Sequence, residues 1–154
     1  MAFGLGEFAE FDTTSPASST SVATIDANVD ILLNSNPIDI ATRTAQDITS
    51  EIEITDSAPL NIVVAGMYRV VISTNSTITA TATLTLRVVY NDGSNDFEVY
   101  NDDVTVSNNA IRVSKTSNSF YADAVTSTVK AYITSDNVGD SSVNVEARLI
   151  QGGA

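Results

Sequence analysis

The sequence contains no cysteine, no histidine and no tryptophan. The first two absences exclude disulfides, thiolate or imidazole zinc sites, cysteine nucleophiles and every catalytic scheme that uses histidine as the base. A Ser–Lys arrangement would remain, but the neighbouring Ser114 and Lys115 would point to opposite faces of a strand. The lack of tryptophan removes the commonest sugar-stacking side chain. We therefore predict that the protein is not an enzyme and needs no cofactor.

Basic residues are scarce. Seven lysines and arginines stand against nineteen acidic residues, which gives a net charge of -12 and a pI near 4.1. Nucleic acid is excluded as a partner, because its binding depends on basic side chains that neutralise phosphates. The N-terminus has no basic, apolar signal pattern, and no window approaches the roughly 18 consecutive apolar residues of a membrane span. We predict no secretory signal and no membrane partner.

The chain of 154 residues fits one domain preceded by an N-terminal arm. We predict a flexible arm over residues 1–24 and a β domain over residues 25–154. The arm has apolar side chains near its tip, followed by the Ser/Thr/Pro-rich linker TTSPASSTS. Two interpretations stay open: a disordered or locally packed terminus, or an anchor that docks into a neighbouring subunit or partner. The candidate partner-binding residues are Phe3, Leu5, Phe8 and Phe11.

Apolar and polar residues alternate with a period of two from Ile25 onward. In ITATATLTLRVVY, residues 78–90, the even-numbered positions are apolar as far as Val88, while the odd-numbered positions are polar as far as Arg87. This alternation predicts a half-buried strand. Similar or shorter candidates are VDILLN, PIDIAT, ITSEIEIT, LNIVVA, MYRVVIS, DFEVY, VTVS, AIRVS, TVKAYIT and SVNVEARLI.

Turn-forming residues separate these segments, and only SNSFYADAVTS admits a helical turn. About eight to ten short strands without helical partners are typical of a sandwich, a jelly roll or a barrel. We predict an all-β fold: an antiparallel sandwich, with a single jelly roll as the leading architecture, and an extended N-terminal arm.

The segment YNDGSNDFEVYNDD, residues 90–103, resembles a calcium loop in composition. Its glycine follows Asn91 and Asp92 directly, so the EF-hand spacing fails, whereas Asn-Asp-Gly suits a tight hairpin turn. We predict a hairpin and leave open whether it also binds calcium. The candidate metal ligands are Asp92, Asp96, Asp102 and Asp103.

Residues 58–151 resemble the single jelly rolls of viral capsid decoration and head-fibre proteins and, more distantly, trimeric domains of the C1q/TNF type. The resemblance rests on the segment from Ala65 to Val70, which leads into a long core strand, and on the alternating final strand from Val143 to Ile150. It implies a trimer with an exposed outer surface and an arm that attaches it to a shell.

The resemblance and the composition together suggest a virion structural protein. We expect a capsid decoration or turret/fibre subunit of a tailed phage or archaeal virus, assembled in the host cytoplasm and located on the virion surface. Its partners would be copies of itself, as a trimer, and a major capsid or other virion protein; a pentamer is built from similar jelly rolls. The alternatives are a receptor- or carbohydrate-binding adhesion module, such as a tail-fibre tip, and a strand-exchanging surface filament.

Overall fold

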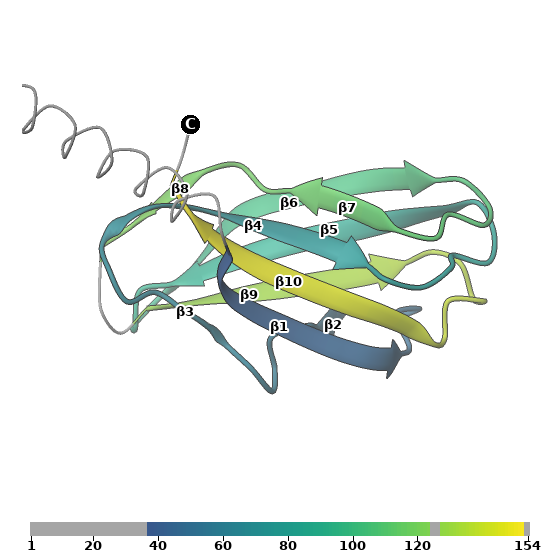
Figure 1. Cartoon of the computed structure of the whole chain (residues 1–154), viewed down its shortest axis with the longest axis horizontal. Helices are drawn as coiled ribbons and strands as arrows, with labels where there is room; N and C mark the ends of the chain where they lie inside the picture. Colours follow the sequence, from purple (N-terminus) through teal and green to yellow (C-terminus); the bar gives the residue numbers. More distant parts are fainter. Residues whose placement is uncertain (1–36, 124–126, 153–154) are drawn as a thin grey trace, which may run out of the picture. The chain divides into compact units, whose positions relative to one another are not determined.

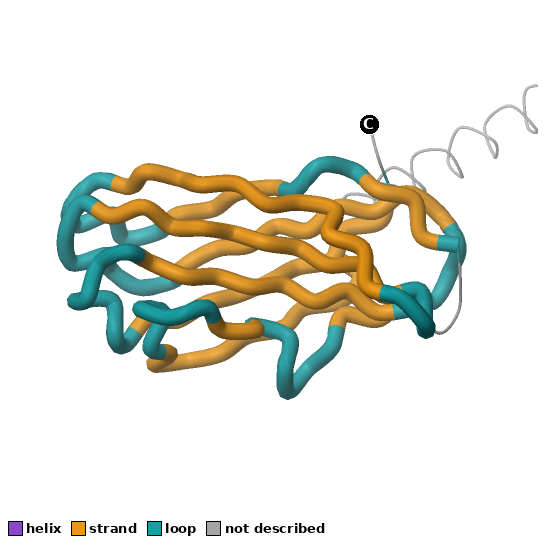
Figure 2. The backbone as a smooth tube through the Cα atoms, turned by 180° about the vertical axis from the view of Figure 1, so that it is seen from behind, coloured by secondary structure: helices purple, strands orange, loops and turns teal. Residues whose placement is uncertain are grey.

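The structure, a computed structural model, describes residues 37–123 and 127–152, and every regular element in these ranges is a β-strand (Figure 2). The strands form two antiparallel sheets. Sheet A contains β1 (Pro37–Gln46), β4 (Gly66–Thr74), β7 (Val113–Thr116), β8 (Phe120–Ala122) and β10 (Val143–Gln151). Sheet B contains β2 (Ile52–Glu53), β3 (Leu60–Asn61), β5 (Ala82–Asn91), β6 (Asp96–Val106) and β9 (Thr128–Ser135).

The strand order is that of a jelly roll. Sheet A runs β1-β10-β4-β7 with β8 also pairing with β4, and sheet B runs β2-β9-β5-β6 with β3 also pairing with β9. The pairs are nested along the chain: β1 with β10, β2 and β3 with β9, β4 with β7 and β8, and β5 with β6. Figure 1 shows the central position of β10 between β1 and β4. Such nesting arises when one long hairpin folds over into two sheets, so the predicted sandwich and jelly roll are confirmed.

The core lies between the sheets because each long strand turns its apolar positions inward. In β5, Leu84, Leu86 and Val88 are buried, while Thr85 and Arg87 between them are half-buried on the other face. β9 and β10 show the same alternation. Each buried leucine or valine contributes roughly 1.5–3 kcal/mol relative to an exposed one. The inward face of β5 is therefore as the sequence predicts.

Several predicted strand boundaries are wrong. The strand predicted from Ile78 begins at Ala82; Ile78 is buried in the preceding connection, where its N–H donates to the carbonyl of Ala110 at 2.9 Å. The segment that admitted a helical turn contains β8, because Phe120–Ala122 pairs with β4. DFEVY and VTVS form one continuous strand, β6. The predicted arm, its boundary at residue 24 and the VDILLN strand lie outside the described residues.

A buried carboxylate joins three connections at one end of the sandwich. Asp140 is 1% exposed, and its carboxylate accepts hydrogen bonds from Ser135 Oγ at 2.6 Å and from Asn137 Nδ2 at 3.1 Å. It also accepts from the N–H and hydroxyl of Thr79, both at 3.4 Å, while its carbonyl accepts from the N–H of Ile48 at 3.1 Å. Asp140 thus ties the β4–β5 and β1–β2 connections to the β9–β10 connection.

Replacing this carboxylate should destabilise the fold. We expect Asp140→Ala to lower the free energy of unfolding by about 1–3 kcal/mol, because buried donors lose their acceptor. Urea denaturation followed by circular dichroism measures the change. Asp56→Ala, at an exposed acidic position, is the control and should stay within about 0.5 kcal/mol of the wild type. Equal effects of the two substitutions would contradict the role of Asp140.

Candidate functional site

The acidic segment forms the tip and the return strand of a hairpin. β5 and β6 pair as far as Asn91 and Asp96, and residues 92–95 connect them. Gly93 has a φ of 96°, a conformation that favours glycine. The carboxylate of Asp92 accepts the N–H of Asn95 at 2.7 Å and of Ser94 at 2.8 Å, and these bonds lower the pKa of Asp92. The predicted hairpin is confirmed.

The four predicted calcium ligands lie on this hairpin, and each carboxylate accepts protein donors. Asp92 accepts the two backbone N–H groups of the turn. Asp96 accepts a hydrogen bond from Asn91 Nδ2 at 2.6 Å. Asp102 accepts one from the hydroxyl of Tyr100 at 3.2 Å, and Asp103 accepts one from Thr85 Oγ1 at 2.7 Å. Within residues 37–123 and 127–152, no three acidic side chains are grouped so that they could hold a metal ion. Calcium binding by this segment, which the sequence leaves open, is not tested by these contacts.

A β-bulge in β6 changes the direction of its side chains. Val88 pairs with Tyr100 and Val89 with Glu98, so Val99 is an extra residue in the ladder. Phe97 and Tyr100, three positions apart, therefore both lie opposite inward-facing residues of β5. Both rings lie at the edge of sheet B, where Tyr100 lines one hollow with Asn118 and Phe97 lines another with Tyr121, from the β7–β8 segment of sheet A.

The first hollow on this side is lined by aromatic rings, and we call it the aromatic groove. It has a volume of about 390 Å³. Tyr90 and Phe97 stack at 6.2 Å between ring centroids, and Phe97 and Tyr121 are 48% and 62% exposed. The hydroxyl of Tyr90 donates to Asp123 Oδ1 at 2.8 Å and holds that carboxylate at the groove. The lining residues are Tyr90, Asp92, Phe97, Val99, Tyr121 and Asp123.

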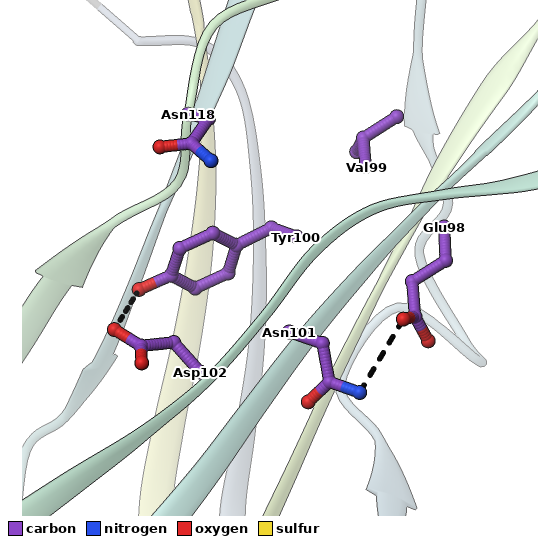
Figure 3. Close-up of a pocket in the computed structure, with 6 residues that line it drawn as sticks. All are labelled: Glu98, Val99, Tyr100, Asn101, Asp102 and Asn118. Atoms are coloured by element: carbon purple, nitrogen blue, oxygen red, sulfur yellow. Dashed lines mark hydrogen bonds between the residues drawn. The ribbon is translucent and has the colours of Figure 1, made fainter.

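A second hollow, the polar cavity, adjoins the aromatic groove, because Val99 lines both. Its volume is about 450 Å³. Figure 3 shows Tyr100, Asp102 and Asn118 on one side of the β6 ribbon and Glu98 and Asn101 on the other. The ion pair between Lys115 Nζ and Asp102 Oδ2, at 3.6 Å, links β7 to β6 beside this cavity. The lining residues are Glu98, Val99, Tyr100, Asn101, Asp102 and Asn118.

The outer face of sheet A has an apolar half, which we call the apolar band. Ile40, Arg148 and Val71 form one row across β1, β10 and β4, because residues paired in an antiparallel sheet point to the same side. Ile40 is 45% exposed, and other members of the band are also partly or largely exposed. The apolar residues of the band are Ile38, Ile40, Met67, Val71, Tyr121 and Ile150.

A guanidinium lies within the apolar band. Arg69 pairs with Ile150 of β10, and its Nε is buried without a hydrogen-bond partner in the described structure. Buried donors without acceptors are uncommon in folded proteins and cost free energy. The exposed apolar side chains of the band favour a contact with another molecule, whereas the Nε of Arg69 is buried within the chain itself.

The outer face of sheet B carries a charged cluster instead. Arg87 Cζ lies 4.0 Å from the ring centroid of Tyr132, and the guanidinium donates two bonds to Glu51 at 2.6 and 3.0 Å. The hydroxyl of Tyr132 donates to Glu53 at 3.1 Å. Burial and the nearby negative charge of Glu53 raise the pKa of Tyr132 to about 12. The cluster fastens β2 to the centre of sheet B.

The sequence did not indicate the aromatic groove or the apolar band. Phe97, Tyr121 and Asp123 come from β6, β8 and the segment after β8, and only the pairing of these elements brings them together. The exposed aromatic residues could have been noticed, but the alternation alone does not predict which rings remain exposed. The predicted partner-binding residues Phe3, Leu5, Phe8 and Phe11 lie outside the described residues.

No protein-family model matches the sequence, and no curated protein matches it either. Among solved structures, a mitogen from Yersinia pseudotuberculosis is similar at 17% identity and a TM-score of 0.44, over 77% of this chain and 90% of that one. A carbohydrate-binding module of the Cellvibrio mixtus lichenase 5A, in complex with cellotriose, is similar at 12% identity and a TM-score of 0.39, over 77% and 92% of the two chains. A pentameric capsid protein from metagenomic phage sequences is similar at 14% identity and a TM-score of 0.33, over 98% and 77%.

These TM-scores are low, so the jelly roll rests on the strand pairing itself, and the similarity carries no functional conclusion. The described part of the chain contains no helix of the length and apolarity that a bilayer crossing requires.

The raised pKa of Tyr132 predicts a loss of stability at alkaline pH. The folded state favours the neutral phenol, so its contribution is complete below the ordinary pKa of 10.0 and is lost as the pH rises toward about 12. We expect the free energy of unfolding to fall across this window, and Tyr132→Phe to reduce the slope by up to about 1.4 kcal/mol per pH unit. Urea titrations at several pH values measure it. An unchanged slope in Tyr132→Phe would show that the phenol does not titrate as described.

Proposed function

We propose that this protein is a virion structural protein, a capsid decoration or turret/fibre subunit that acts on the virion surface. In this proposal its jelly-roll domains associate as a homo-oligomer, and the protein has no catalytic role and needs no cofactor. The observation that carries the proposal is the apolar band on the outer face of sheet A.

The apolar band is suited to contact between copies of the chain. Its aliphatic and aromatic side chains lie partly or largely exposed on a regular sheet, and their burial on association would remove apolar surface from water. Arg148, which lies in one row with Ile40 and Val71, forms an ion pair with Glu146 at 2.6 Å. The positive charge within the band is therefore partly neutralised in the single chain.

The edges of the sheets are less suited to this contact. β6 pairs only with β5 among the described strands, so its outer edge exposes backbone groups. Its acidic residues and its bulge are features that oppose edge-to-edge pairing. The acidity of this segment therefore has a structural explanation, and it favours association through the face of sheet A over strand exchange along β6.

The N-terminal arm would attach the oligomer to a shell. Residues 1–24 contain three acidic and no basic residues, together with the apolar Phe3, Leu5, Phe8 and Phe11. In the proposal these apolar side chains dock into a major capsid or other virion protein and become ordered on contact. The linker after them sets the distance between the shell and the jelly roll.

A charge placed in the apolar band should dissociate the oligomer. We expect the wild type to form a discrete oligomer, a trimer according to the sequence resemblance, and Ile40→Asp to reduce it to a monomer with unchanged circular dichroism. Mass photometry or light scattering measures the mass and separates a trimer from a pentamer.

Ile111→Asp is the matched control, because Ile111 is an exposed isoleucine in the β6–β7 connection, outside the band. It should leave the oligomeric mass unchanged. A monomeric wild type, or an oligomer that survives Ile40→Asp, would contradict association through the apolar band.

Removing the arm should abolish attachment to the shell without unfolding the β domain. We expect deletion of residues 1–20 to prevent co-sedimentation with capsids of the virus that encodes the protein, while the urea midpoint stays unchanged. Replacement of Phe3, Leu5, Phe8 and Phe11 by serine, in a chain of full length, should have the same effect. Retained co-sedimentation of both variants would refute the arm as an anchor.

A further inference from the structure

We propose that the open side of the sandwich, between β6 and the β7–β8 segment, binds an uncharged oligosaccharide. The aromatic groove would hold one sugar ring, and the polar cavity that adjoins it at Val99 would hold the next part of the chain. The site goes beyond the proposed virion role, and the two are compatible if the contact between copies leaves Tyr121, at the edge of the apolar band, uncovered.

The aromatic groove offers ring faces to a sugar. Phe97 comes from the edge of sheet B and Tyr121 from the edge of sheet A, and both rings are about half exposed or more. Tyr90 is buried beneath them and contacts the rings of Phe97 and Phe120 at centroid distances of 6.2 and 5.8 Å, which fixes the base of the groove. The apolar C–H face of a pyranose stacks on such rings, so phenylalanine and tyrosine here fill the role for which the chain lacks tryptophan.

The polar groups of the two hollows suit hydroxyls. Asp123 uses Oδ1 for the Tyr90 hydroxyl, and no described donor reaches its Oδ2, which can accept from a ligand. In the polar cavity the phenol of Tyr100 donates to Asp102 at 3.2 Å and the amide of Asn101 to Glu98 at 3.4 Å, while the amide of Asn118 can donate and accept. A sugar hydroxyl also donates and accepts, so it can bond to the amide of Asn118 and to the carboxylate of Asp123.

The charge of the residues that line the two hollows narrows the class of ligand. The residues that line the two hollows include four carboxylates, Asp92, Asp102, Glu98 and Asp123, and no lysine or arginine. Anionic sugars would be repelled. An ammonium ion could stack on the rings, but it donates only and would offer no acceptor to the amide of Asn118. An uncharged polyhydroxylated chain fits both hollows.

The volumes agree with this ligand. Hollows of about 390 and 450 Å³ are within the range, roughly 300–1,000 Å³, that is common for small-molecule sites. Each is open to solvent along the side of the sandwich, and together they form a track along β6 rather than one enclosed pocket. Such a track suits an oligosaccharide better than a single small ion.

The test uses the full-length protein with maltotriose, cellotriose, mannotriose and tri-N-acetylchitotriose as probes, and with sialyllactose and choline for comparison. Saturation-transfer NMR and calorimetric titration measure contact and affinity. We expect at least one uncharged trisaccharide to bind, and Phe97→Ala and Tyr121→Ala each to weaken it about tenfold or more. Asp123→Asn, which keeps the shape of the side chain, should weaken binding through the lost charge-assisted hydrogen bond.

Ile111→Ala is the control, because it removes an exposed apolar side chain that lines neither hollow. Retained circular dichroism shows that each variant is folded, and the exposed positions of Phe97 and Tyr121 favour this result. The proposal is overturned if no uncharged trisaccharide binds, if Ile111→Ala weakens binding as much as Tyr121→Ala, or if choline or sialyllactose binds more tightly through the same residues.

Discussion

The pairing of β10 with β1, the last and the first of the described strands, is the constraint on which the rest of the structure depends. β10 lies between β1 and β4, so Ala147 pairs with Ala41 on one side and with Ile72 on the other. These contacts join residues 106 and 75 positions apart, and the loop entropy that they cost is recovered only when the two inward faces meet. The nested pairs of the jelly roll then follow, because each further hairpin closes inside the one before it.

The same nesting leaves one side of the sandwich open. β6 ends sheet B and the β7–β8 segment ends sheet A, and the ion pair between Lys115 and Asp102 bridges the two edges. The bulge at Val99 directs Phe97 and Tyr100 toward this side. The aromatic groove and the polar cavity are therefore products of topology and of one irregular residue, whereas the apolar band belongs to the regular face of sheet A. The two surfaces share Tyr121, which stands at the edge between them.

Local patterns predicted much of the fold. The alternation in β5 placed Leu84, Leu86 and Val88 inside, and the Asn-Asp-Gly turn located the β5–β6 hairpin, because both signals depend on near neighbours in the chain. The alternation did not predict the local structure where contacts between residues distant in the sequence determine it. Ile78 lies in a connection yet is buried, since Ala110 and Asn109 supply its backbone partners. The segment around Phe120 is a strand because β4 offers an edge for it.

The sequence by itself determined the class of the fold, the absence of histidine and cysteine chemistry, and the inward faces of the long strands, because composition and a period of two are local properties. Only the tertiary structure decided which of the acidic and aromatic residues share a surface. Asp92, Phe97, Tyr121 and Asp123 come from a turn, two edge strands and the segment after β8. Their proximity depends on strand order, register and a bulge, which are set by packing between distant segments and leave no periodic signal in the chain.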